Sequence, residues 1–178
     1  MAETMDETMT TVTDDYETAA ERCKAELRLW LRLLSCTSLI ETAVRTRLRE
    51  TFEVTLPQFD LMAALEREPD GLTMGALSRR LMVSNGNVTG ITERLVAEGL
   101  VAREPSPSDR RAFVVKLTPA GRRAFLAMAM VHEGWIADFF DDLAGEEIDG
   151  LMGLLGKVKQ AVHAKTRNAN ASNGRETP

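Results

Sequence analysis

Residues 84–95 read SNGNVTGITERL, and this short stretch decides the fold. Ser84 predicts the start of a helix, because a serine hydroxyl accepts a hydrogen bond from a backbone amide of the first turn. Apolar residues then recur at helical spacing, while small polar residues occupy the other side. The apolar positions are Val88, Ile91 and Leu95, and the polar ones are Asn85, Asn87, Thr89 and Thr92. A helix with this division docks on a domain and presents polar side chains to a partner.

The segment that follows changes from a helical to a strand-like pattern. Gly99 predicts the end of the helix. Residues 100–103 (LVAR) and 112–117 (AFVVKL) predict two short strands, joined by the polar turn PSPSDRR. Thr118 followed by Pro119 predicts the start of another helix, since proline fits the first helical position. We therefore expect a helix, a β-hairpin and a helix in succession.

Three helices are predicted before residue 84. Residues 18–52 contain neither glycine nor proline and predict one long helix. Its stretch 27–40 is apolar on more than one face, which indicates a subunit interface. Pro57 predicts the first turn of a second helix, and Thr73 caps a short third one.

Two more helices and two disordered ends complete the prediction. One helix runs from residue 119 to about residue 140, and another from residue 146 to residue 164. Residues 1–17 are acidic, and residues 165–178 are polar without an apolar period, so both ends are expected to be disordered. The expected fold is mainly α with a small β-hairpin wing, in the element order of a winged helix-turn-helix.

The chain has 178 residues and a net charge of −5, but the charge is unevenly distributed. Residues 1–17 hold six acidic and no basic residues. Residues 73–123 hold nine basic residues against four acidic ones, a local charge of +5. A local basic footprint matters more for DNA binding than the overall charge. The acidic composition therefore does not exclude a nucleic-acid partner.

The residue types over 84–111 favour a DNA-binding role. Asparagine pairs with adenine edges and a threonine methyl packs on thymine, so we expect base contacts in the major groove from Asn85, Asn87 and Thr89. Phosphate contacts are expected from Ser84, Arg94 and Arg110. Arg111, at the tip of the hairpin, is expected in the minor groove, where negative potential concentrates. Asp109 is expected to orient one of the two guanidinium groups.

The stretch from Leu56 to Gly121 resembles the MarR family (multiple antibiotic resistance regulators). The resemblance is carried by an Asp-x-Arg followed by a Leu-Thr, here Asp109, Arg111, Leu117 and Thr118. It implies a MarR-like domain over 18–164, with a DNA-binding lobe over 56–118. It also implies a two-fold homodimer built from helices in 18–52 and 119–164, and a ligand pocket between that interface and the lobe.

The expected function is that of a ligand-responsive regulator, most simply a repressor that binds a palindromic operator. The expected effector is an aromatic carboxylate or its coenzyme A thioester, and no other cofactor is expected. Six residues are candidates for its pocket, because apolar walls would hold the ring and arginines the anion: Arg28, Trp30, Arg32, Leu34, Phe59 and Met62. Whether the ligand releases or promotes DNA binding stays open.

Two alternatives remain open from the residues alone. A redox-sensing repressor would use Cys23, which Arg22 and Lys24 flank, whereas Cys36 among leucines is expected to be buried. A winged-helix module for protein contacts is the other alternative, although it has no need of a basic hairpin tip. No catalytic constellation or metal-ligand spacing stands out, so neither an enzyme nor a metal site is expected. No signal peptide or membrane span is recognised, and a cytoplasmic protein is expected.

Overall fold

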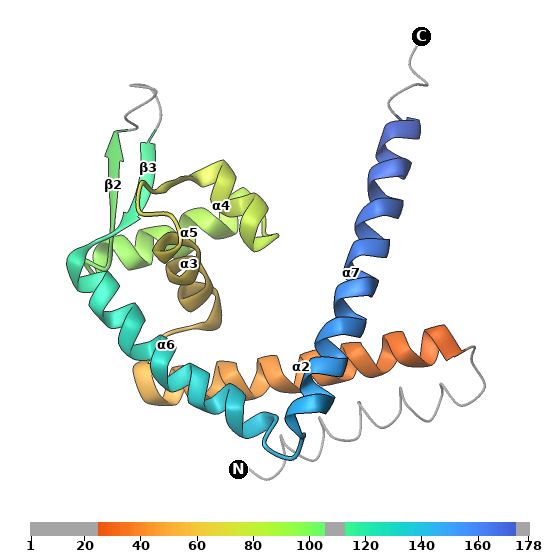
Figure 1. Ribbon diagram of the computed structural model, residues 1–178. Coiled ribbons are helices and arrows are strands. Elements are labelled where there is room, and N and C mark those ends of the chain that lie inside the picture. The colour runs from red at the N-terminus through yellow and green to blue at the C-terminus, as the bar shows by residue number, and fades with distance from the viewer. Residues whose placement is uncertain (1–24, 106–112, 174–178) are drawn as a thin grey trace, which may run out of the picture. The chain divides into compact units, whose positions relative to one another are not determined.

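The computed structural model describes residues 25–105 and 113–173 (Figure 1). Its packing divides the chain into two units, one that ends at Trp135 and one that begins at Ile136. Helices dominate both, and the one small sheet of the described residues lies in the first unit. The prediction of a mainly helical chain with a β-hairpin wing is confirmed.

The first unit contains the elements of a winged helix-turn-helix in the predicted order. The sheet is antiparallel with strand order β1-β3-β2, and β2 pairs with β3 from Val101 opposite Leu117 to Pro105 opposite Phe113. The short strand β1, which pairs with β3, was not predicted. The elements are α2 (Ala25–Phe52), α3 (Leu56–Glu66), β1 (Leu72–Thr73), α4 (Met74–Leu81), α5 (Asn85–Ala97), β2 (Val101–Pro105), β3 (Phe113–Leu117) and α6 (Pro119–Phe139), which continues past Trp135.

Side-chain caps fix where the helices of this unit begin, as the sequence predicts. The hydroxyl of Thr73 accepts a hydrogen bond from the amide of Ala76 (3.2 Å), and that of Ser84 accepts one from Asn87 (3.4 Å). Between them Met82 adopts a left-handed conformation (φ 54°), which turns the chain from α4 into α5. This tight turn sets the direction in which α5 leaves the lobe.

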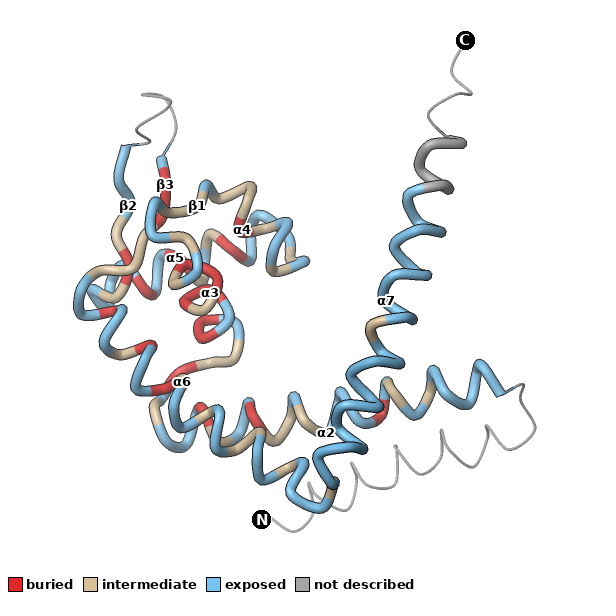
Figure 2. Tube along the Cα trace, in the orientation of Figure 1, coloured by how far each residue is buried: buried red, intermediate tan, exposed pale blue. Residues whose placement is uncertain are grey.

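The core of the first unit lies under α3, α5 and β3 (Figure 2). The fully buried side chains come from α2, α3, α4, α5 and β3, which makes the lobe one packed body. They are Leu48, Leu61, Met62, Leu77, Val88, Thr92, Leu95 and Val115. Burial of a leucine or valine contributes about 1.5–3 kcal/mol, so this core holds α5 rigidly in place.

The root of the wing is locked to the start of α6. The hydroxyl of Thr118 donates to the carbonyl of Gly99 (2.8 Å) and accepts from the amide of Gly121 (2.9 Å). A Cβ atom at Gly121 would collide with the carbonyl oxygen of Leu100, so only glycine fits there. The end of α5, the wing and α6 therefore meet at one rigid point.

The second unit consists of the end of α6 and the helix α7 (Gly145–Asn173). The carboxylate of Glu147 caps α7 by accepting from the amide of Ala144 (2.8 Å). The predicted end at residue 164 was too early, because α7 continues through part of the segment 165–178 that was expected to be disordered. A stripe of apolar side chains on α7 is exposed: Ile148, Leu151, Leu155, Val158 and Val162. Among the described residues, no helix has the length and apolar character to cross a bilayer.

Candidate nucleic-acid interface

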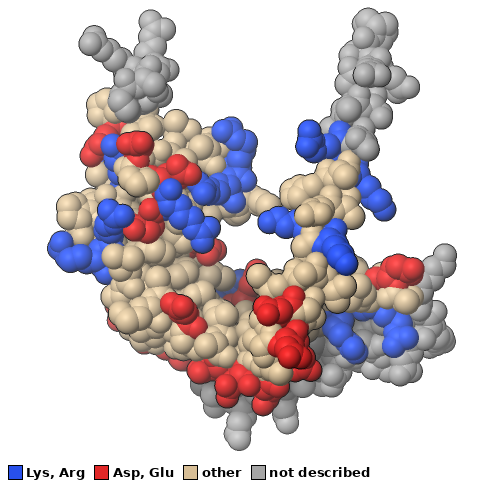
Figure 3. All heavy atoms as spheres, in the orientation of Figure 1, with Lys and Arg blue, Asp and Glu red and all other residues tan. Residues whose placement is uncertain are grey.

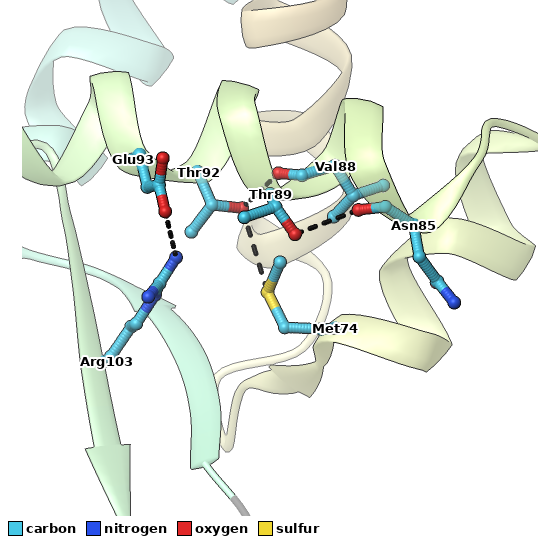
Figure 4. Close-up of polar contacts among 7 residues, drawn as sticks. All are labelled: Met74, Asn85, Val88, Thr89, Thr92, Glu93 and Arg103. Atoms are coloured by element: carbon cyan, nitrogen blue, oxygen red, sulfur yellow. Dashed lines mark hydrogen bonds and ion pairs between the residues drawn. The ribbon is translucent and has the colours of Figure 1, made fainter.

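The first turns of α5 present the polar residues that the sequence singles out. Ser84, Asn85 and Asn87 are exposed, and Thr89 is half-buried with its hydroxyl donating to the carbonyl of Asn85 (2.9 Å) (Figure 4). The amide groups of both asparagines are therefore available to a partner, whereas the Thr89 hydroxyl already has an acceptor. Its methyl group remains the part that suits a thymine contact.

The sequence pattern predicts Thr92 on this polar side of the helix, and that prediction is wrong. Its side chain is fully buried, and its hydroxyl donates to the carbonyl of Val88 (2.7 Å) with the sulfur of Met74 at 3.9 Å (Figure 4). The hydrogen bond back to the preceding turn removes the cost of burying the hydroxyl. Thr92 thus anchors α5 in the lobe together with Val88 and Leu95.

The wing extends from the lobe beside α5. Arg103 on β2 approaches Glu93 on α5, with 3.9 Å between the guanidinium and the carboxylate (Figure 4). Both side chains are exposed, so this ion pair contributes little to the stability of the fold. The predicted tip residues Asp109, Arg110 and Arg111 lie outside the described residues, and their roles stay predictions.

A groove on the other side of α5 was not predicted from the sequence. It has a volume of about 490 Å³ and lies between the C-terminal half of α2, the start of α3 and the stretch of α5 from Gly86 to Arg94. Three arginines line it: Arg45 and Arg49 from α2, and Arg94 from α5. Only Arg94 was singled out from the sequence, as a phosphate contact. For the other two arginines, the sequence offered one signal, which is that Arg45 and Arg49 are separated by one helical turn and so share a helix face.

Other basic residues of the lobe are neutralised by carboxylates. Arg80 pairs with Glu68 (2.7 Å), Lys116 with Glu104 (3.2 Å) and Arg122 with Glu66 (2.9 Å). Figure 3 shows basic side chains interspersed with acidic ones on the visible face of the lobe. The local charge of +5 over residues 73–123 is therefore partly balanced in space by these carboxylates.

An aromatic cluster joins α2, α3 and α6 within the first unit. The ring centroid of His132 lies 4.9 Å from that of Phe59 and 6.4 Å from that of Trp135, and Trp135 lies 6.2 Å from Phe52. Burial against these rings lowers the pKa of His132 below its ordinary value of 6.5. His132 is thus half-buried in aromatic packing.

The structure does not gather the six residues predicted for an effector pocket. Phe59 and Met62 are buried in the core, whereas Trp30 and Leu34 are exposed on α2. Arg28 and Arg32 lie on the same exposed end of α2. Phe52, the last residue of α2, belongs to the same aromatic cluster as Phe59. At about 1.5 Å per residue, Trp30 lies roughly 30 Å away from Phe52 along the helix. The predicted pocket would need another chain to close it.

Among the described residues, neither a cysteine nor a group of metal-ligating side chains defines a second site. Cys23 lies outside the described residues, so its redox role stays untested. Cys36 is exposed in this chain, contrary to the expectation of burial. Within 25–105 and 113–173, no three His, Cys, Asp or Glu side chains are grouped to hold a metal ion.

The capped helix α5, anchored on one side and polar on the other, with a hairpin beside it, defines a winged helix DNA-binding protein. Comparison with known proteins narrows this class. A model of the MarR family matches residues 52–112. A MarR family transcriptional regulator from Silicibacter pomeroyi, of known structure, is 31% identical, with a TM-score of 0.66 over 77% of this chain and 94% of that one. The chain belongs to the MarR family of transcriptional regulators.

Two further relatives agree with this membership. The transcriptional activatory protein BadR of Rhodopseudomonas palustris is 36% identical over 114 residues, which are 62% of this chain and 65% of BadR. The structure of CouR from Rhodococcus jostii, bound to p-coumaroyl-CoA, shares the fold with a TM-score of 0.64 at 18% identity, over 73% of this chain and 90% of CouR. Because family members are transcriptional regulators, the expectation of a regulator that is not an enzyme is confirmed, and the alternative of a protein-interaction module is disfavoured.

Proposed function

We propose that this chain represses transcription in the cytoplasm by binding a palindromic operator as a homodimer, and that a small aromatic acid or its coenzyme A thioester releases it. The observation that carries the proposal is the exposed polar start of α5, held rigidly by the buried Val88, Thr92 and Leu95. A rigid helix with free amide groups at its N-terminal end is what base readout in the major groove requires.

Each contact has a proposed role. Asn85, Asn87 and Thr89 read base edges, while Ser84 and Arg94 hold phosphates. These five residues lie on one helix and its cap, so one approach to the duplex serves them all. At the tip of the wing, Arg110 is proposed to hold a phosphate and Arg111 to enter the minor groove, with Asp109 orienting a guanidinium.

The homodimer is supported by apolar surface that the single chain leaves open. On α2, the side chains of Leu29 and Trp30 are 55% and 57% exposed, and α7 carries its own apolar stripe. Exposed apolar side chains gathered on a helix in this way are typical of an interaction site. A two-fold dimer places two copies of α5 on one face of the duplex, about one helical turn apart.

The proposals for the effector class and for the direction of regulation draw on two relatives, CouR and BadR. CouR shows that this fold accommodates an aryl-CoA thioester. BadR carries the name of an activatory protein, so activation also occurs among the relatives. We favour repression, because an operator-bound dimer released by a ligand is the simplest linkage between the two binding events.

Operator binding is tested by fluorescence anisotropy of the purified protein on DNA from upstream of its own gene. A scrambled duplex is the control, and both are measured at two salt concentrations. We expect binding at least ~1,000-fold tighter to the native DNA, with affinity that falls as salt rises. Transcription in vitro from the same DNA then distinguishes repression from activation. Equal, weak binding to all genomic fragments would contradict the proposal.

A further inference from the structure

The groove beside α5 gathers guanidinium groups from two helices. Arg45 and Arg49 are separated by one turn of α2, so they share a helix face and lie about 6 Å apart along its axis. Arg94 lines the same groove from α5. Cationic side chains that are distant in the sequence thus border one concave surface of the first unit.

The charges of these arginines are not neutralised by carboxylates of the lobe. Within the described residues, none of the three has an ion pair, whereas Arg122 on α6 is held by Glu66 at 2.9 Å. The carboxylate of Glu98, one turn beyond Arg94, accepts a hydrogen bond from Gln58 (3.5 Å) instead. The groove therefore offers guanidinium donors that are left for an external anion, and such donors suit phosphate oxygens.

The groove adjoins the surface that is proposed to read bases. Asn87 lines it together with Gly86 and Gly90, which follow each other by one turn on α5. A Cβ atom at either glycine would meet nothing within 4 Å in the part of the chain that the structure describes. This side of α5 is thus bare backbone with open space beyond it, which leaves room for a bulky partner.

The groove and the wing lie on different sides of α5. Glu93 faces the wing through Arg103 of β2 (Figure 4), whereas Arg94, the next residue, points about 100° away around the helix and lines the groove. A helix in the major groove, which is about 12 Å wide, lies between two phosphate backbones. With the wing directed at one backbone, the groove arginines are placed for the other.

We infer that Arg45 and Arg49, together with Arg94, hold the phosphate backbone of the operator, so that α2 is a direct part of the DNA interface. The inference rests on the proposed function, which assigns a phosphate to Arg94 alone and assigns α2 only to the dimer. Phosphate contacts carry no sequence information, but they fix the orientation of a protein on the duplex. The arginines of α2 thus position α5, and the asparagines of α5 read the bases.

The salt dependence of binding tests this inference. On B-DNA, each phosphate contact contributes about 0.9 to the slope of log affinity against log salt concentration. The full-length protein is titrated by anisotropy against the operator and against a scrambled duplex over a series of salt concentrations. A dimer of Arg45→Gln/Arg49→Gln loses two contacts per copy, so we expect the slope to fall by roughly 3–4. We expect the affinity to fall at least about tenfold, by the same factor on both duplexes.

Two control variants separate the phosphate contact from a structural role. Arg67→Gln removes the same charge at an exposed position, and Arg67 is the C-cap of α3, at the other end of that helix from the groove. We expect its affinity to stay within about twofold of wild type, with an unchanged slope. Arg45→Lys/Arg49→Lys keeps both charges, and we expect it to restore the wild-type slope. Urea unfolding checks that all variants are folded.

Neutral phosphate analogues locate the contact on the DNA. Methylphosphonate linkages replace the phosphates of one half-site in turn, so that each duplex lacks one charge and keeps every base. We expect neighbouring linkages that weaken binding by the wild type but not by Arg45→Gln/Arg49→Gln, because in that variant the partner of the phosphate is already lost. Arg67→Gln should respond to every linkage as the wild type does.

Two outcomes would overturn the inference. A wild-type slope in Arg45→Gln/Arg49→Gln would show that no phosphate contact was lost, whether or not the affinity falls. Equal responses of this variant and the wild type at every methylphosphonate linkage would show that the arginines touch no phosphate of the half-site. A wild type that binds operator and scrambled DNA equally would count against the proposed function instead, and the slopes on the scrambled duplex would still test the groove.

Discussion

The DNA-binding lobe and the helix α7 differ in how far their apolar side chains are exposed to solvent. In the lobe, Leu61, Met62 and Leu77 are completely shielded from water. On α7, the side chains of Leu151 and Leu155 are 47% and 44% exposed. The lobe thus contains its own stabilising core, whereas the stripe on α7 is exposed in the single chain. In the proposed homodimer, one chain accordingly combines a lobe that packs by itself with a helix that packs against a second copy.

The largest expected effect comes from breaking the apolar stripe of α7. In Leu151→Glu/Leu155→Glu, two leucines per copy that the proposed dimer would bury become charged, each worth up to about 1.5–3 kcal/mol of burial. We expect monomers by sedimentation equilibrium. Operator binding by anisotropy should weaken about 1,000-fold, or about 4 kcal/mol at ~1.4 kcal/mol per tenfold. The near-ultraviolet circular dichroism of the lobe should be retained.

Gln160→Glu is the control for this stripe, because residue 160 lies on the opposite side of α7 from Leu151. It adds a charge to the same helix, and we expect a dimer with operator affinity close to wild type. A double leucine variant that stays dimeric and binds the operator normally would contradict the role of α7 in assembly.

The second prediction compares two glycines, one from each region. Gly121→Ala forces a methyl group onto the carbonyl of Leu100, and we expect a loss of about 2–3 kcal/mol in the free energy of unfolding. Gly153→Ala on α7 meets nothing within 4 Å, and we expect a gain of about 1 kcal/mol from helix propensity. Urea unfolding measures both. A destabilising Gly153→Ala would show that α7 packs closely there against a partner.

Local signals made the helix boundaries predictable. Thr73, Ser84 and Thr118 cap helices through hydrogen bonds within three residues, so short stretches of sequence contain the information. The strand β1 was missed because its two residues are strand only by pairing with β3, far along the chain. The end of α7 was not predicted, because the prediction of a helix relied on apolar residues at helical spacing and the last turns of α7 have none.

The site was predictable in part, again because some of its features depend on local signals in the sequence. The exposed start of α5 follows from its cap and its apolar face, but Thr92 was placed on the wrong side. Its position four residues after Val88 and three before Leu95 puts it on the buried face, and polarity alone was misleading. The groove combines Arg45 and Arg49 with Arg94, which only the tertiary fold brings together.

The third prediction separates readout by the lobe from assembly by α7. Asn87→Ala removes an amide that pairs with one base, and we expect a loss of about 1–3 kcal/mol that is confined to one operator position. Asn85→Ala should act at a neighbouring position. The measurement is anisotropy on an operator series with each base pair changed in turn. Equal weakening on every sequence would refute base readout, and would resemble the effect of losing the dimer.

The smallest expected effect concerns His132 in the aromatic cluster of the first unit. Burial lowers its pKa below the ordinary 6.5, so the unfolded chain takes up a proton at a higher pH than the folded one. Stability should therefore decline as the pH falls through 6.5, and level off below the folded pKa. His132→Gln removes this titration, and the free energy of unfolding in urea should lose part of its decline between pH 7.5 and 5.5. His163→Gln, an exposed imidazole on α7, is the control. A His132→Gln profile parallel to wild type would show that the imidazole is protonated equally well in the folded protein.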